Sequence, residues 1–184
     1  MKASVVIKTD KLAAVVKSIT ALTGKDVLIG IPDASTDRRP DEVEHGPMTN
    51  ATLGYIHEFG SPAANIPARP FLIPGVQDAA DKYEARLKKA ATLALDGNLS
   101  GVDAELNKAG MQAASSVKAK INSGDFIPLA EATLRARARR GRQGAQAELD
   151  SRKAGNAPNN DNAKPLIDTG QLRNSITYVV RGKK

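Results

Sequence analysis

Three prolines, at positions 62, 67 and 70, place the strongest constraint on how this chain can fold. Each proline fixes its own φ angle and moves the preceding residue toward an extended conformation. We therefore expect residues 61–70 to form a stiff, extended arm that leads to the apolar run Phe71–Ile73. The arm has no residue types typical of a catalytic site. Its residues therefore indicate a role in setting the path of the backbone rather than in catalysis.

Helical periodicity predicts two longer helices after this arm. Apolar and alanine residues recur every three or four positions from about Val76 to Leu95, and again from Ser100 or Asp103 to Ile121. The chain has only three Phe, three Tyr and no Trp, so smaller residues must fill its core. Small residues on both stripes allow close packing, and we expect residues 96–99 to join the helices as an antiparallel pair.

Short apolar runs predict a few strands. Val5–Ile7 and Asp26–Ile31 favour strands, and residues 175–180 alternate in a way typical of a half-buried strand. We expect the N-terminal and C-terminal strands to pair. The predicted fold is one α+β domain over residues 1–184, with a small, mostly antiparallel sheet packed against the helix pair.

Two shorter helices and one capped turn complete this prediction. The first helix begins at Thr9 or Asp10 and ends at a left-handed Gly24, and the second begins at Asn50 and ends at Gly60. Near the C-terminus, Pro165 leads into a turn of helix at 170–174. Either of two residues can cap that turn through its side-chain oxygen, Asp168 or Thr169.

A basic segment at 135–153 and a polar loop at 154–163 follow the helix pair. The basic segment begins with an arginine run: Arg135, Arg137, Arg139, Arg140 and Arg142. It contains no aromatic residue for base stacking, which argues against recognition of single-stranded nucleic acid. Contacts to DNA phosphates, salt bridges to an acidic neighbouring subunit, and a solvated helix face all stay open. The polar loop has almost no hydrophobic side chains, so we expect it to be mobile.

Composition limits the other classes of function. Lys and Arg number 27 against 20 Asp and Glu, a net charge of +7 that permits association with nucleic acid or an acidic surface. The chain has no cysteine, which excludes disulfides, thiolate nucleophiles and Cys-based zinc sites. No stretch approaches the roughly 18 apolar residues of a membrane span, and the N-terminal apolar run is too short for a signal peptide. We expect a soluble protein made in a reducing cytoplasm.

Catalytic and metal motifs are weak. Gly141–Gly144 lacks the spacing of a phosphate loop, and His57 with Glu58 forms only half of a zincin motif. A metal site with His45 would require an acidic loop to fold over the helix, so a solvated helix face is the favoured interpretation. No sequence spacing supports a catalytic pair of carboxylates formed by Glu58 and Asp168. We therefore predict no enzyme activity, no cofactor and no metal.

Four segments, in order, resemble a known family: 53–60 (LGYIHEFG), 66–72 (IPARPFL), 128–134 (PLAEATL) and 164–176 (KPLIDTGQLRNSI). Together they are similar to the tail-completion, or neck, proteins of long-tailed DNA bacteriophages, often labelled virion morphogenesis proteins. The resemblance covers roughly residues 27–181. Its Glu-Phe-Gly, Pro-Ala-Arg-Pro-Phe and Asp-Thr-Gly-x-Leu elements are specific together and weak singly.

The resemblance implies a structural protein of the virion. Such proteins form a homo-oligomeric ring, hexameric or dodecameric, at the joint between the portal or adaptor complex and the tail or tail-terminator proteins. Genomic DNA passes through the lumen of that joint. No reaction and no cofactor come with the resemblance, and the expected location is the head–tail junction of a virion assembled in the host cytoplasm.

The resemblance also assigns residues to fold-shaping and subunit contact. These are Glu58, Phe59, Gly60, Ile66, Pro67, Arg69, Pro70, Phe71, Asp168, Thr169, Gly170, Leu172 and Arg173. Two other functions stay open. One is a DNA-binding packaging accessory protein that uses the arginine run, and the other is a virion-associated hydrolase that uses Glu58 or Asp168.

Overall fold

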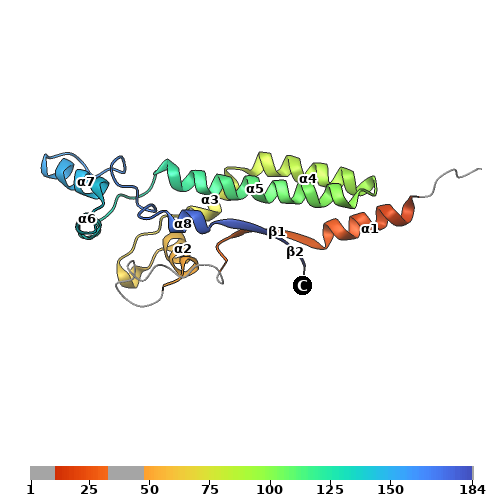
Figure 1. Cartoon of the computed structure of the whole chain (residues 1–184), viewed down its shortest axis with the longest axis horizontal. Helices are drawn as coiled ribbons and strands as arrows, with labels where there is room; N and C mark the ends of the chain where they lie inside the picture. The colour runs from red at the N-terminus through yellow and green to blue at the C-terminus, as the bar shows by residue number, and fades with distance from the viewer. Residues whose placement is uncertain (1–10, 33–47, 184) are drawn as a thin grey trace, which may run out of the picture. The chain divides into compact units, whose positions relative to one another are not determined.

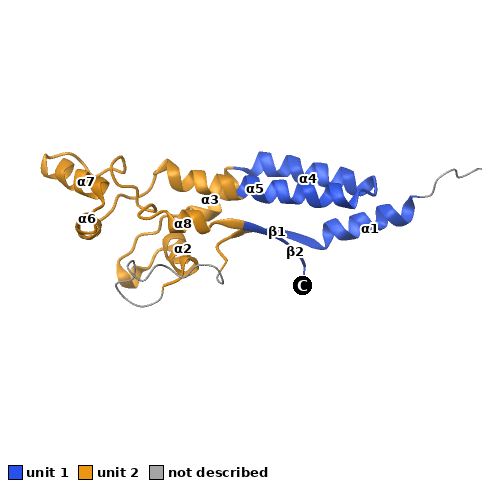
Figure 2. Cartoon of the chain, viewed as in Figure 1, with its two compact units in different colours: residues 1–28, 79–113, 178–184 blue, residues 29–78, 114–177 orange. Residues whose placement is uncertain are grey.

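The structure is a computed structural model that describes residues 11–32 and 48–183. Within these residues the chain forms eight α-helices and one two-stranded antiparallel sheet, which confirms the predicted α+β class (Figure 1). The chain divides into two compact units (Figure 2). Unit 1 contains residues 1–28, 79–113 and 178–184, and unit 2 contains residues 29–78 and 114–177. The sequence patterns predicted no such division, because each unit is assembled from segments far apart in the chain.

Unit 1 contains the helix pair and most of the sheet. Its elements are α1 (Leu12–Thr23), α4 (Ala80–Leu95), residues 99–113 of α5 (Leu99–Ser123), and most of β1 (Lys25–Gly30) and β2 (Thr177–Gly182). Small and aliphatic residues of α4 and α5 are buried together and packed against side chains of both strands; the cluster comprises Ala90, Ala94, Val102 and Leu106, with Leu22, Val27, Leu93 and Val180 against it. The predicted packing of the longer helices on the sheet is confirmed.

One glycine allows β2 to approach α5 closely. An ideal Cβ on Gly110 would lie 2.3 Å from Cδ2 of Tyr178, so any larger residue would displace the tyrosine ring. The strand β2 also begins two residues later than expected, at Thr177 and not at residue 175. Its partner is β1, whereas Val5–Ile7 lies outside the described residues.

Helix α1 follows the prediction, but its end does not. Gly24 has φ −83° and so is not left-handed, because its amide continues the helical pattern by donating to the carbonyl of Thr20. The predicted caps at positions 9 and 10 lie outside the described residues. Ser18 is the one buried residue of α1. Three apolar side chains, spaced four and three residues apart, stay exposed at 68%, 54% and 37%: Leu12, Val16 and Ile19, here called the α1 stripe.

Unit 2 holds five helices of its own and the last part of α5. They are α2 (Asn50–Phe59), α3 (Leu72–Gln77), α6 (Glu131–Arg139), α7 (Gln143–Lys153) and α8 (Gln171–Ser175). The helices α6 and α7 enclose a small core with the segments on either side of them; it comprises Leu129, Leu134, Ala145, Leu149 and Ala163. The helix α2 packs on α8. The cap of α2 is Thr49, not Asn50, since the Thr49 hydroxyl accepts a hydrogen bond from the amide of Thr52.

The proline-rich arm begins with a closed turn rather than an extended run. Pro62–Ala64 form a 3-10 helix, and Asn65 takes a left-handed conformation with φ 53°. Asparagine tolerates this region better than most residues. The turn brings Ser61 and Ile66 together in an antiparallel bridge, and residues 67–70 follow without regular secondary structure.

The helix expected from Val76 to Leu95 is two helices. α3 ends at Gln77 and α4 begins at Ala80, so the break coincides with the division between the units. The periodicity of the apolar residues runs through this break, which is why the sequence pattern indicated one helix.

The 154–163 segment makes contacts that a mobile loop would lack. The Asn159 amide and the Asn162 side chain donate to the two carboxylate oxygens of Glu148, at 3.1 and 3.3 Å. The Asn160 side chain donates to the carbonyls of Gly124 and Phe126. Asparagine side chains donate all but one of these bonds, and the backbone amide of Asn159 donates the other. A prediction based on missing hydrophobic residues does not detect them.

The buried Glu148 should make the stability of the protein depend on pH. Burial on its own raises the pKa of Glu148, but the hydrogen bonds from Asn159, Arg152 and Asn162 outweigh it and lower the pKa overall. A lowered pKa in the folded state stabilises the fold above the pKa of an unfolded glutamate, about 4.3. This stabilisation is lost as the pH falls further through the folded pKa.

We therefore expect Glu148→Gln to destabilise the protein at pH 7, and the difference from the wild type to shrink toward pH 3. Urea unfolding across this pH range measures both effects. Asp161→Asn, an exposed change in the same segment, is the control and should stay near the wild type. A difference that is the same at every pH would contradict this account of Glu148.

Candidate functional site

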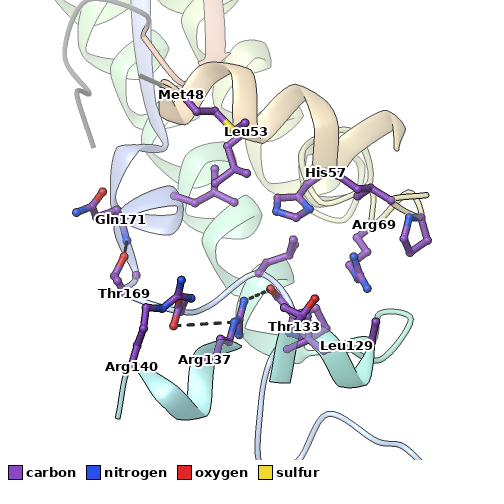
Figure 3. A pocket seen from close by; sticks show the side chains of 18 of the residues that line it. Met48, Leu53, His57, Arg69, Leu129, Thr133, Arg137, Arg140, Thr169 and Gln171 are labelled. Atoms are coloured by element: carbon purple, nitrogen blue, oxygen red, sulfur yellow. Dashed lines mark hydrogen bonds and ion pairs between the residues drawn. The ribbon is translucent and has the colours of Figure 1, made fainter. Parts of the chain in front are cut away.

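The segments that carry the family resemblance meet around one pocket in unit 2. The pocket has a volume of about 410 Å³, and every one of the four segments contributes to its lining (Figure 3). From α2 come Leu53 and His57, and the arm and the α6 region contribute Asn65, Ile66, Pro67, Arg69, Leu129, Thr133, Arg137 and Arg140. The C-terminal segment adds Pro165, Leu166 and residues 168–172. We call this cavity the central pocket.

Glu58, of the Glu-Phe-Gly element, caps the start of α3. Its Oε2 accepts hydrogen bonds from the amides of Phe71 and Leu72 at 2.7 and 2.8 Å, and its Oε1 accepts from the amide of Ile73 at 3.0 Å. The first amides of a helix have no partner within the helix, and a negative charge there is favourable. The side chain is buried, so the carboxylate fixes α2 to the end of the arm.

Gly60 provides the turn that this arrangement needs. It has φ 77°, and an ideal Cβ at this position would lie 2.9 Å from the amide nitrogen of Ala68. The turn also lets the amide of Arg69 donate to the carbonyl of His57 at 2.7 Å. The Glu-Phe-Gly element therefore specifies how the chain leaves α2.

Arg69 is buried and bound to backbone carbonyls. Its Nε donates to the carbonyl of Ile127 at 2.9 Å, and its Nη2 donates to that of Pro128 at 3.3 Å. Burial lowers the pKa of Arg69. These bonds hold the arm against the segment that precedes α6, which is a fold-shaping role. A contact of Glu58 or Arg69 with another subunit stays a prediction, since their bonds described here lie within the chain.

Arg137 binds the backbone of the C-terminal segment. Its Nη1 donates to the carbonyls of Lys164 and Ile167, both at 3.0 Å, and its Nη2 donates to that of Pro165 at 2.8 Å. Burial lowers the pKa of Arg137, and the nearby Asp168 carboxylate acts in the opposite direction. One guanidinium group thus fixes the path of the chain into the Asp-Thr-Gly element.

Asp168 binds arginines and does not cap α8. Its carboxylate accepts from Arg140 Nη2 and Arg142 Nε, each at 2.9 Å, and lies 3.9 Å from Arg137 Nε. The residue at the cap position of α8 is Gly170, with φ 81° and no side-chain cap. Of the two predicted caps, Asp168 was therefore wrong, because the arginine run takes its carboxylate. The hydroxyl of Thr169, the other candidate, accepts a hydrogen bond from the amide of Gln171 at the start of α8, at 3.4 Å.

The arginine run does not form one helical face. The helix α6 ends at Arg139, and Arg142 precedes α7. Arg135 is paired with Glu131 at 2.5 Å, whereas Arg139 is exposed and has no ion pair among the described residues. Contact of this run with DNA or an acidic partner stays a prediction. Fewer of its arginines are without an ion pair than the sequence suggested.

The other predicted contact residues divide by exposure. Phe71 and Leu172 are buried within unit 2, whereas Phe59, Pro67 and Pro70 are exposed; Ile66, Thr169, Gly170 and Arg173 are half-buried. The sequence reasoning missed Tyr55, whose ring lies 4.8 Å from that of Phe59. The spacing of four residues on one helix was the signal that would have found this pair.

The hydrogen bonds of Glu58 and Asp168 limit the catalytic chemistry that their carboxylates can perform. Both carboxylate oxygens of Glu58 accept backbone amides, and both of Asp168 accept arginines. Over residues 11–32 and 48–183, no group of three or more His, Cys, Asp or Glu is placed to hold a metal ion. In the same residues, no helix has the length and apolar character to cross a membrane.

Comparisons with protein-family models, curated proteins and solved structures found no match. The likeness to phage neck proteins therefore depends on the four segments alone, and membership of that family stays a prediction.

The Glu58 carboxylate should contribute measurably to folding. We expect Glu58→Gln to lower the free energy of unfolding by about 1–3 kcal/mol, because the amide NH₂ group faces backbone donors that the carboxylate accepted. Chemical denaturation of the purified protein measures the loss. Glu84→Gln, at an exposed position of α4, should change stability by less than about 0.5 kcal/mol. Equal stability of the two variants would show that the cap is unimportant.

Even a conservative substitution of Arg137 should destabilise the protein. Lysine keeps the charge but lacks the planar fork that reaches three carbonyls, so we expect Arg137→Lys to cost about 2–3 kcal/mol of unfolding free energy. The matched control is Arg139→Lys, at an exposed position of the same helix, which should be nearly neutral. Thermal or urea unfolding compares them, and a neutral Arg137→Lys would refute the role given to this guanidinium.

Proposed function

We propose that this chain is a structural subunit of a tailed DNA phage, which forms a ring in the neck and joins or completes the tail at the head–tail interface. One observation carries the proposal. The buried charged residues of the resembling segments bind the chain's own backbone, as Glu58 does with three amides and Arg69 with two carbonyls. Motifs that build shape in this way suit a component of an assembly.

Exposed apolar surface supports the same proposal. Monomeric proteins rarely expose contiguous apolar patches larger than a few hundred Å², and such patches mark contact sites. In unit 1 the side chains of the α1 stripe are 68%, 54% and 37% exposed. In unit 2 the rings of Tyr55 and Phe59 are 67% and 56% exposed. A subunit with identical neighbours would bury these surfaces on assembly.

The two alternatives have less support from the contacts. A DNA-binding accessory protein is favoured by the net charge of +7 and the exposed Arg139, but Arg137, Arg140 and Arg142 are engaged within the chain. A hydrolase would need an available carboxylate, and Glu58 and Asp168 are each held by several donors.

Electron microscopy of particles assembled without this protein tests the proposal. We expect DNA-filled heads and separate tails, because a missing joint leaves both parts complete. Supplying the protein in trans should restore joined particles. Empty heads would favour the packaging accessory protein instead, and joined particles that fail to infect would favour the hydrolase.

A further inference from the structure

The helix α2 carries an aromatic pair that the described residues of unit 2 leave more than half exposed. Tyr55 and Phe59 lie with ring centroids 4.8 Å apart and an angle of 50° between the rings, and both are more than half exposed. They are two of only three Tyr and three Phe in the whole chain. Adjacent aromatic residues of this kind are the anchors that protein interfaces bury at their centre. We call this pair the aromatic knob.

A different face of α2 lines the central pocket. Leu53 and His57 precede the two knob residues by two positions each, which is roughly 200° around an α-helix. Figure 3 shows both side chains projecting from α2 toward the α6 side of the pocket, where Thr133 and Arg137 lie. The knob therefore lies on a different face of α2 from Leu53 and His57, and Phe59 borders a second hollow beside the arm.

The pocket has the size and chemistry to receive the knob. Its volume of about 410 Å³ falls in the range of roughly 300–1,000 Å³ that encloses drug-sized ligands, so it has room for two aromatic rings. Aliphatic side chains, including Leu53, Ile66 and Leu129, supply apolar walls. Arg140 also lines it, with 38% of its side chain exposed, and a guanidinium attracts the face of an aromatic ring.

We propose that the aromatic knob of one copy inserts into the central pocket of the next copy. Because the knob and the pocket lie on different faces of α2, one copy can offer its knob to one neighbour and its pocket to another. The contact is therefore head-to-tail, and repeating it generates a closed ring or an open filament rather than a two-fold dimer. This inference rests on the proposed function, whose ring requires a contact of this kind, and it names the residues that make it.

Two variants of the full-length protein remove the two halves of this contact separately. Tyr55→Ala with Phe59→Ala deletes the knob, and Thr133→Trp fills the pocket from an exposed position of α6. Ala132→Trp, exposed on the same helix but outside the pocket lining, is the control for the added bulk. Ile73→Ala, at a residue 51% exposed in the same unit, is the control for the lost apolar surface.

Analytical ultracentrifugation of each variant, alone and mixed, provides the test. We expect the wild type and both controls to self-associate, and the knob and pocket variants each to weaken self-association by roughly 30-fold or more, the effect of losing an interface anchor. A 1:1 mixture of the two variants should form a heterodimer and no larger species, since each retains only one half of the contact. Circular dichroism melting confirms that every variant is folded.

Three results would overturn the inference: a wild type that stays monomeric at all concentrations, variants that assemble like the wild type, or a mixture that stays monomeric. These are separable from failure of the proposed function. If the variants still form rings and joined particles, the neck role stands and another surface makes the contact. If particles lacking the protein are joined and infectious, the neck role fails whatever the variants do.

Discussion

Unit 2 depends on hydrogen bonds from buried charged side chains to the backbone of its irregular segments. The arm after α2 and the segment before α8 have few helical or strand partners, and backbone groups left unpaired away from water are costly. Glu58 supplies acceptors for three amides, and Arg69 and Arg137 supply donors for five carbonyls between them. Charges in these positions need no substrate to explain them, because they replace missing secondary structure.

The central pocket is a consequence of the same bonds. Arg69 holds the arm on one side of the cavity, and Arg137 holds the C-terminal segment on another. The helix α2 is fixed between them by Glu58 and by its packing on α8. Segments that are distant in sequence therefore enclose one cavity, and the shape of that cavity is set by interactions that also hold unit 2 together.

The parts of this fold that the sequence could predict are those with a local signal. The apolar periodicity located α1, α2 and α5, and the alternation near the C-terminus located β2. The engagement of Asp168 by Arg140 and Arg142 had no such signal, since residues 26 and 28 positions apart meet only through the turn between α6 and α7. The bonds of Asn160 to residues 34 and 36 positions earlier were hidden for the same reason.

The arginine run illustrates how the proposed functions compete for the same charges. Arg140 contributes to the pocket lining and binds Asp168, so a neighbouring aromatic residue in the pocket would bury part of its guanidinium and withdraw it from solvent. Contact with DNA phosphates needs accessible, uncompensated charge, and its strength falls steeply with salt. Arg139 meets that condition, whereas Arg135 is compensated by Glu131. A ring closed through the pocket would therefore hold DNA weakly at this surface, which suits a channel through which DNA must move.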